Sequence, residues 1–97
     1  MIASFGDRTT EDLYHGRPTQ RASRFPKDVL PVALRKLDMV NSAAKLGDLR
    51  SPPGNRLEAL GGDLKGFYSI RINDQWRVVF RWEGTDAHGV KLVDYHR

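Results

Sequence analysis

Cysteine is missing from this sequence of 97 residues, and its absence excludes disulfide bonds and metal sites built on thiolates. The histidines, His15, His88 and His96, are too scattered along the chain to form a zinc-binding pattern. The glycine-rich pair Gly61-Gly62 belongs to no phosphate-cradling motif. We therefore expect a protein that uses neither a metal nor another cofactor.

Targeting and membrane-spanning segments are lacking as well. The N-terminus, MIASFGDRTT, has neither the basic region nor the long apolar region of a signal peptide. No apolar run approaches the roughly 20 residues that a helix needs to cross a bilayer. We expect a soluble cytoplasmic protein with a single domain over residues 1–97, because an apolar fraction of 39% suffices for one small core.

The chain has no polybasic tail. Its formal net charge is +4 and its isoelectric point about 9.8, but basic and acidic residues are interspersed in both halves. An excess this small is typical of an ordinary solvated surface and is also compatible with a polyanionic partner. Any contact with RNA or DNA would therefore come from patches on the folded protein.

The N-terminal part predicts a strand, a short helix and a loop. Residues 1–5 are an apolar start typical of a strand, and Asp7 is suited to cap a helix that ends at Gly16. Residues 17–25 show no periodicity and form a basic loop, either a solvated linker or an edge facing a polyanion; its arginines are Arg17, Arg21 and Arg24. We expect residues 17–27 to be mobile, since they show neither core residues nor strong turn signals.

Residues 28–44 predict an amphipathic helix. Pro31 falls in its first turn, where a missing N–H costs little. The apolar residues recur at helical spacing and should form a core-facing stripe: Leu30, Ala33, Leu34, Leu37, Val40 and Ala44. The segment SPPGN then interrupts the chain, and the remainder has β character.

Two alternating segments, residues 67–72 and 76–82, predict a β-hairpin. A two-residue turn would place arginines opposite core residues, whereas a three-residue loop at 73–75 keeps one face apolar. The second register pairs Ile72 with Trp76, Ile70 with Val78, and Tyr68 with Phe80. We predict this register.

The same register places Arg71 opposite Arg77 on the other face, with Arg81 further along the strand. Facing like charges cost a few tenths to about 1 kcal/mol. Either neighbouring carboxylates such as Glu58 offset the repulsion, or the face is built to receive phosphate, which suits the planar guanidinium group. We favour the phosphate interpretation, because the arginines sit on a rigid sheet.

Two further strands complete the predicted sheet. Residues 55–60 should pair with Leu57 and Ala59 inward and with Arg56 and Glu58 outward. The final segment, VKLVDYH, should form a fourth strand, whose faces stay ambiguous. The predicted fold class is α+β, with an N-terminal strand and two to three helices packed on a largely antiparallel sheet of about four strands.

The segments NRLEALGGDLKGFYSIRINDQWRVVFRW and VDYH make the chain resemble the HigB group of toxins in the RelE superfamily, over nearly its whole length. The sequences of the segments RSPPGNRLEAL and INDQWR are most similar to the GraT branch of this group. The resemblance implies a compact microbial-RNase-type fold. It also implies a toxin of a type II toxin–antitoxin system that enters the ribosomal A site, in the 30S subunit, and cuts mRNA.

The resemblance further implies a helix-turn-helix antitoxin of the HigA type, and contact with operator DNA only through the toxin–antitoxin complex. Asp94, Tyr95 and His96 match the family's catalytic DYH. Well-studied members also have a His and a Lys in a segment LHPLKG. Here Glu58 stands in place of that His and Gly61 in place of that Lys, so the expected set is half present.

These residues suggest cleavage in which the RNA 2′-hydroxyl attacks the adjacent phosphorus without a metal. Such a reaction needs a base, an acid for the leaving oxygen, and cations for the developing charge. His96 is the natural proton-transfer group, and Asp94 could orient it or act as the general base. Tyr95 could stack on a nucleobase or hold a phosphate, and Glu58 is an alternative general base. The cations fall into two groups: Arg71 and Arg77 for the transition state, and Arg56, Lys65 and Arg81 for binding RNA.

Two other functions stay open from the sequence. ParE-like toxins share the fold and poison DNA gyrase without catalysis, and a decayed toxin would act only as a corepressor with its antitoxin. The arginine-rich face and the terminal DYH favour the ribonuclease, and the missing His and Lys favour the alternatives.

Overall fold

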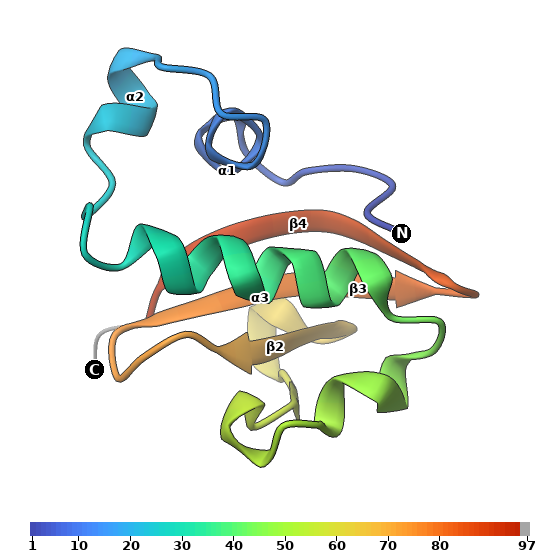
Figure 1. The fold of residues 1–97 in the computed structure, drawn as a ribbon. Coiled ribbons are helices and arrows are strands. Elements are labelled where there is room, and N and C mark those ends of the chain that lie inside the picture. Colours follow the sequence, from blue (N-terminus) through green and yellow to red (C-terminus); the bar gives the residue numbers. More distant parts are fainter. Residues whose placement is uncertain (96–97) are drawn as a thin grey trace.

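A computed structural model describes residues 1–95 of the chain. In these residues, helices pack on one face of an antiparallel sheet whose strands follow the order β1-β2-β3-β4 (Figure 1). The helices are α1 (Arg8–Tyr14), α2 (Gln20–Ser23) and α3 (Leu30–Ser42), and the strands are β1 (Glu58–Ala59), β2 (Phe67–Arg71), β3 (Trp76–Glu83) and β4 (Asp86–Asp94). Short 3₁₀ segments, η1 (Leu46–Arg50), η2 (Pro53–Asn55) and η3 (Gly62–Leu64), lie between α3 and β2. The α+β fold class is thereby confirmed.

The β2–β3 hairpin has the predicted register. Ile70 pairs with Val78 and Arg71 with Arg77, and the N–H of Ile72 donates to the carbonyl of Trp76 over 2.9 Å. Successive residues of a strand point to opposite faces. The face of the hairpin that carries Ile70 and Val78 therefore packs against α3, whereas Arg71 and Arg77 lie together on the face that α3 does not cover.

The predicted stripe of α3 forms the centre of the core. Ala33, Leu37 and Val40 have no exposed surface, and Pro31 lies in the first turn as expected. Ala44 is exposed, contrary to the prediction, because α3 ends at Ser42 and the extended backbone of the next residue turns Ala43 inward instead.

Residues 1–6 cover the outer edge of β4. The predicted N-terminal strand is reduced to two isolated parallel bridges, between Ile2 and Ala87 and between Phe5 and Val90. Gly6 approaches β4 so closely that a Cβ there would lie 2.6 Å from the carbonyl oxygen of Gly89. Glycine is therefore required at this contact, and the edge of the sheet is closed to further pairing.

Helix α1 begins and ends where the sequence predicted. The carboxylate of Asp7 accepts the N–H of Thr10 over 2.7 Å, and Gly16 follows the helix with a φ of +68°. The buried hydroxyl of Thr10 accepts the N–H of Leu92 over 2.9 Å. This bond joins the helix to β4, the predicted fourth strand, whose Val90 and Leu92 face the core.

Residues 17–27 differ from the predicted loop. They contain α2, and Ala22 and Phe25 are buried in the core, so the expectation that this segment lacks core residues was wrong. The ring of Phe25 packs edge-on against Trp76 with centroids 4.7 Å apart. The carboxylate of Asp12 also ties the segment to α1, since it accepts bonds from Thr19 and Arg21.

The predicted strand at residues 55–60 is also shorter than expected. Only Glu58 and Ala59 pair with β2, and Ala59 is exposed rather than inward, while Leu57 packs partly buried against the core. The cause lies just before the strand: η2 ends at Asn55, and Arg56 adopts left-handed backbone with a φ of 46°. The chain can therefore become extended only after this residue.

Candidate functional site

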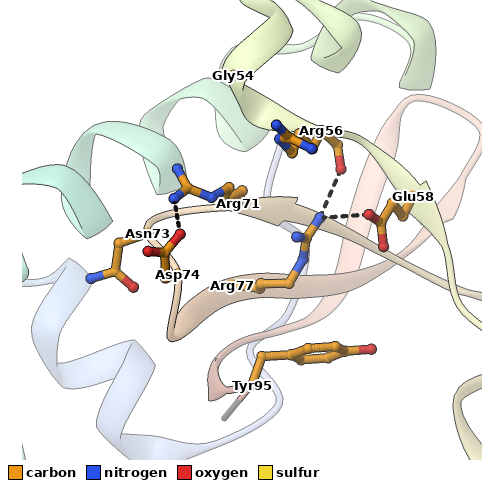
Figure 2. A pocket seen from close by; sticks show the side chains of 8 residues that line it. All are labelled: Gly54, Arg56, Glu58, Arg71, Asn73, Asp74, Arg77 and Tyr95. Atoms are coloured by element: carbon orange, nitrogen blue, oxygen red, sulfur yellow. Dashed lines mark hydrogen bonds and ion pairs between the residues drawn. The ribbon is translucent and has the colours of Figure 1, made fainter. Parts of the chain in front are cut away.

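The face of the sheet that carries Arg71 and Arg77 holds a cleft of about 680 Å³. It is bounded by the end of η2, by β1, by the β2–β3 loop and by the residue that follows β4 (Figure 2). Its lining residues are Gly54, Arg56, Glu58, Arg71, Asn73, Asp74, Arg77 and Tyr95.

Arg77 lies at the centre of the cleft and is held by fixed acceptors (Figure 2). Its Nε donates to the hydroxyl of Ser69 over 2.7 Å, and its Nη2 donates to the backbone carbonyl of Arg56 over 2.7 Å. The residue is only 9% exposed. The cleft thus contains a positive charge whose position is set by β2 and by the segment before β1.

The same guanidinium group has two further neighbours. A carboxylate oxygen of Glu58 lies 3.9 Å from Nη2, and the ring centroid of Tyr95 lies 5.9 Å from Cζ. The side chain of Glu58 is half exposed, so water screens this pair. A cation, an accessible carboxylate and an aromatic ring therefore meet on one side of the cleft.

Arg71 is held much less firmly. Its Nη2 lies 2.5 Å from Asp74 in the hairpin loop, but the carboxylate of Asp74 is fully exposed. Exposed ion pairs of this kind contribute little to stability and rearrange at small cost. Arg71 and Arg77 thus each lie beside a carboxylate, Asp74 and Glu58, which offsets the repulsion between the two facing arginines. Arg71 also remains able to turn toward an anionic ligand.

The two described residues of the DYH motif lie on different sides of the sheet. The N–H of Tyr95 donates to the carbonyl of Gln75 over 2.5 Å, and its ring lines the cleft. Asp94 pairs with Trp76 and accepts a 3.0 Å bond from the side chain of Gln75, but it does not line the cleft. His96 lies outside the described residues.

Lys65 and Arg81 do not line the cleft either. Lys65 is exposed directly after η3, and the guanidinium group of Arg81 lies over the ring of Phe67 at 5.8 Å. The cleft brings together Arg56, Glu58, Arg71, Arg77 and Tyr95 of the residues named from the sequence.

Sequence reasoning missed the contribution of Gly54, Asn73 and Asp74 to the cleft. The side chain of Asn73 accepts the N–H groups of Gln75 and Trp76, which fixes the hairpin loop. The predicted three-residue loop contained the signal for Asp74, since it placed a carboxylate three residues after Arg71. Gly54 left no comparable signal, because its position depends on η2.

Within residues 1–95, no group of three or more His, Asp or Glu side chains could hold a metal ion. No helix in that range is long and apolar enough to span a membrane. The described cleft instead offers guanidinium groups that fit phosphate oxygens and a half-exposed carboxylate that can accept a proton.

Solved toxin structures share this fold. The chain matches one in the YoeB-YefM complex from Staphylococcus aureus with a TM-score of 0.61 and 16% identity, covering 100% of this chain and 99% of that one. It matches YafQ from E. coli strain BL21(DE3) with a TM-score of 0.54 and 12% identity, covering 97% of this chain and 93% of that one. At such identities the likeness establishes the fold alone.

Sequence comparison establishes the family. The chain is 40% identical over 95 residues to Toxin HigB-1 of Vibrio cholerae, covering 98% of this chain and 94% of that protein. It is 31% identical over 101 residues to Endoribonuclease HigB of Proteus vulgaris, covering 99% and 100%. Residues 3–96 match the family model described as the RelE-like toxin of type II toxin-antitoxin system HigB. The chain therefore belongs to the HigB family of RelE-like toxins.

Proposed function

We propose that this HigB-family toxin is a metal-independent endoribonuclease that cuts mRNA in the ribosomal A site and so inhibits translation. Support comes from the relative named Endoribonuclease HigB, which is similar over the whole chain. The observation that carries the proposal is the nearly buried Arg77, fixed by Ser69 and Arg56 at the centre of an open cleft. A charge fixed in advance stabilises a transition state without reorganising during the reaction.

In this proposal, Arg77 binds the phosphate oxygens on which charge develops. Arg71 exchanges its exposed contact with Asp74 for the same phosphate, and Arg56 binds the RNA backbone at the rim of the cleft. The ring of Tyr95 supports an unstacked base, an interaction that proteins commonly use for single-stranded RNA.

Proton transfer is assigned to two groups. Glu58 takes the proton of the 2′-hydroxyl, because its half-exposed carboxylate lies beside Arg77. His96 delivers a proton to the leaving 5′-oxygen, as the match to the family's terminal motif suggests. Asp94 serves a different purpose: its bond to Gln75 holds the end of β4 against the hairpin loop and so supports Tyr95.

The ribosome supplies what this sparse site lacks. Gly61 provides no cation where the family has a lysine, so binding of the mRNA must depend more on the ribosome, which holds the codon in a defined position.

We also propose that the toxin acts in the cytoplasm and is neutralised by a helix-turn-helix antitoxin of the HigA type. The similar fold found in a YoeB-YefM complex supports a protein partner of this general kind.

The test is primer extension on a defined mRNA in a reconstituted translation system, with and without ribosomes. The variants are Arg77→Ala and His96→Ala, with Arg8→Ala as a control that removes an exposed arginine from α1. We expect discrete cuts at A-site codons that require ribosomes, persist in the control and disappear in both other variants. Intact mRNA in this system would contradict the proposal. If cells that express the toxin nevertheless stop growing, a gyrase inhibitor is favoured, and if they grow normally, a corepressor is favoured.

A further inference from the structure

Asn55 is fully buried and lies in sequence between Gly54 and Arg56, two residues that line the cleft. Its Nδ2 donates to the backbone carbonyls of Leu49 and Ser51, both over 3.2 Å, so it fixes the turn that joins η1 to η2. Its Oδ1 accepts a hydrogen bond from the ammonium group of Lys36. Asn55 therefore links two successive turns of the chain to helix α3.

Lys36 is an unusual partner for this amide, because it is only 7% exposed on a core-facing part of α3. Among the described residues, no carboxylate forms an ion pair with it. Burial lowers the pKa of Lys36, and the nearby charges of Arg35 and Arg71 lower it further. Burying an ammonium group in such surroundings costs stability, so an apolar side chain would suit the core better.

Arg56, the residue after Asn55, supplies the backbone carbonyl that accepts a hydrogen bond from Nη2 of Arg77. Arg56 adopts left-handed backbone, with a φ of 46°, and is the one non-glycine residue of the described chain with a positive φ. This conformation directs its carbonyl oxygen to Nη2 of Arg77 at 2.7 Å (Figure 2). Left-handed backbone is unfavourable for a residue with a Cβ, so neighbouring contacts must maintain it.

We propose that Lys36 and Asn55 are positioning residues for Arg77, acting through the backbone of Arg56. The proposal rests on the function proposed above, in which Arg77 stabilises the transition state. Lys36 holds the amide of Asn55 in one orientation, and Asn55 fixes the turn that imposes the left-handed conformation. The carbonyl of Arg56 is thereby presented to the guanidinium group.

Lys36→Met tests the proposal, because methionine fills the same space without donating a hydrogen bond. Arg35→Met is the matched control, since it removes an adjacent exposed charge from the same helix. The measurements are kcat and KM for cleavage on ribosomes, the melting temperature, and the NMR signal of the Arg77 Nε–H group. That group is bonded to Ser69, so its chemical shift and exchange rate report the position of the guanidinium group.

For Lys36→Met we expect kcat to fall by about 10²-fold with KM within about twofold of wild type, as misplacement of a catalytic group produces. The melting temperature should stay within about 5 °C, because the lost hydrogen bond and the removed burial of charge have opposite effects. The Arg77 signal should shift and exchange faster. Arg35→Met should match wild type in all these measurements.

An unchanged kcat and an unchanged Arg77 signal in Lys36→Met would overturn the proposal, as would an equal loss in Arg35→Met. Should Lys36→Met not fold, Asn55→Asp decides: it keeps an acceptor for Lys36 but loses both donations to the turn, and we expect the same loss of kcat and the same shift. Wild type that does not cut mRNA would refute the proposed function, whereas the NMR signal would still test the positioning of Arg77.

Discussion

At the scale of single residues, the two facing arginines differ in how firmly they are held. Arg77 is buried and bonded to a hydroxyl and a backbone carbonyl, whereas Arg71 contacts one exposed carboxylate. The alternation of the hairpin predicted that both lie on one face. It could not predict the contact with Arg56, because that contact joins residues far apart in sequence and depends on a left-handed backbone.

Arg56→Gly separates the two contributions of Arg56 at the cleft. Glycine favours the left-handed backbone, so the carbonyl should still hold Arg77, and the free energy of unfolding should stay equal or rise by up to about 1 kcal/mol. The lost cation should raise KM for mRNA cleavage with little change in kcat. Urea denaturation and cleavage kinetics check this, and a kcat reduced as strongly as in Arg77→Ala would contradict it.

Thr10→Val removes the hydroxyl that joins α1 to β4. The buried N–H of Leu92 would lose its acceptor, so we expect the free energy of unfolding to fall by about 1–3 kcal/mol. Thr10→Ser keeps the hydroxyl and serves as the control, with a smaller loss. Urea midpoints measure both, and equal stability of Thr10→Val and wild type would show that the bond contributes nothing.

At the scale of elements, long periodic segments were predictable and short ones were not. Helix α3 and the β2–β3 register followed from periodicity, because a register slip would have placed arginines in the core. Residues 17–27 gave a wrong prediction, since α2 spans four residues and only Ala22 and Phe25 in that segment are buried hydrophobics. Too few apolar positions recur there to reveal a period.

The contact of Asp12 with α2 predicts acid-dependent stability. The pKa of Asp12 is lowered below its usual value of 3.8, most strongly by the hydrogen bond from Arg21 and less strongly by the one from Thr19. Because the pKa is lower in the folded state, ionised Asp12 stabilises the fold above about pH 3.8, and this contribution is lost as the pH falls through the folded pKa.

Asp12→Asn should therefore melt at a lower temperature than wild type at neutral pH, with the difference shrinking below pH 3.8. Thermal melts of both proteins between pH 7 and pH 2.5 measure the difference. Asp38→Asn, which alters an exposed carboxylate on α3, is the control. A difference that stays constant over the whole range would contradict the assignment.

At the scale of the whole molecule, one face of the sheet packs against helices and the other face is open. Helix α3 and the N-terminal helices cover one face (Figure 1) and pack against it to form the core. The other face carries the cleft. This division was predictable from alternation, as was the pairing of the arginines. Asp94 shares a face with its partner Trp76 at the end of β4, whereas the ring of Tyr95, directly after the strand, lines the cleft.

Arg77→Lys tests whether cleavage depends on the fixed position of the Arg77 guanidinium group and not on its positive charge alone. Lysine keeps the positive charge but cannot bond to Ser69 and to the carbonyl of Arg56 together. Single-turnover cleavage of mRNA on ribosomes should be slower than wild type by on the order of 10²-fold, with ribosome binding unchanged. Cleavage at the wild-type rate would show that a positive charge anywhere in the cleft suffices and that the fixed position of Arg77 does not stabilise the transition state.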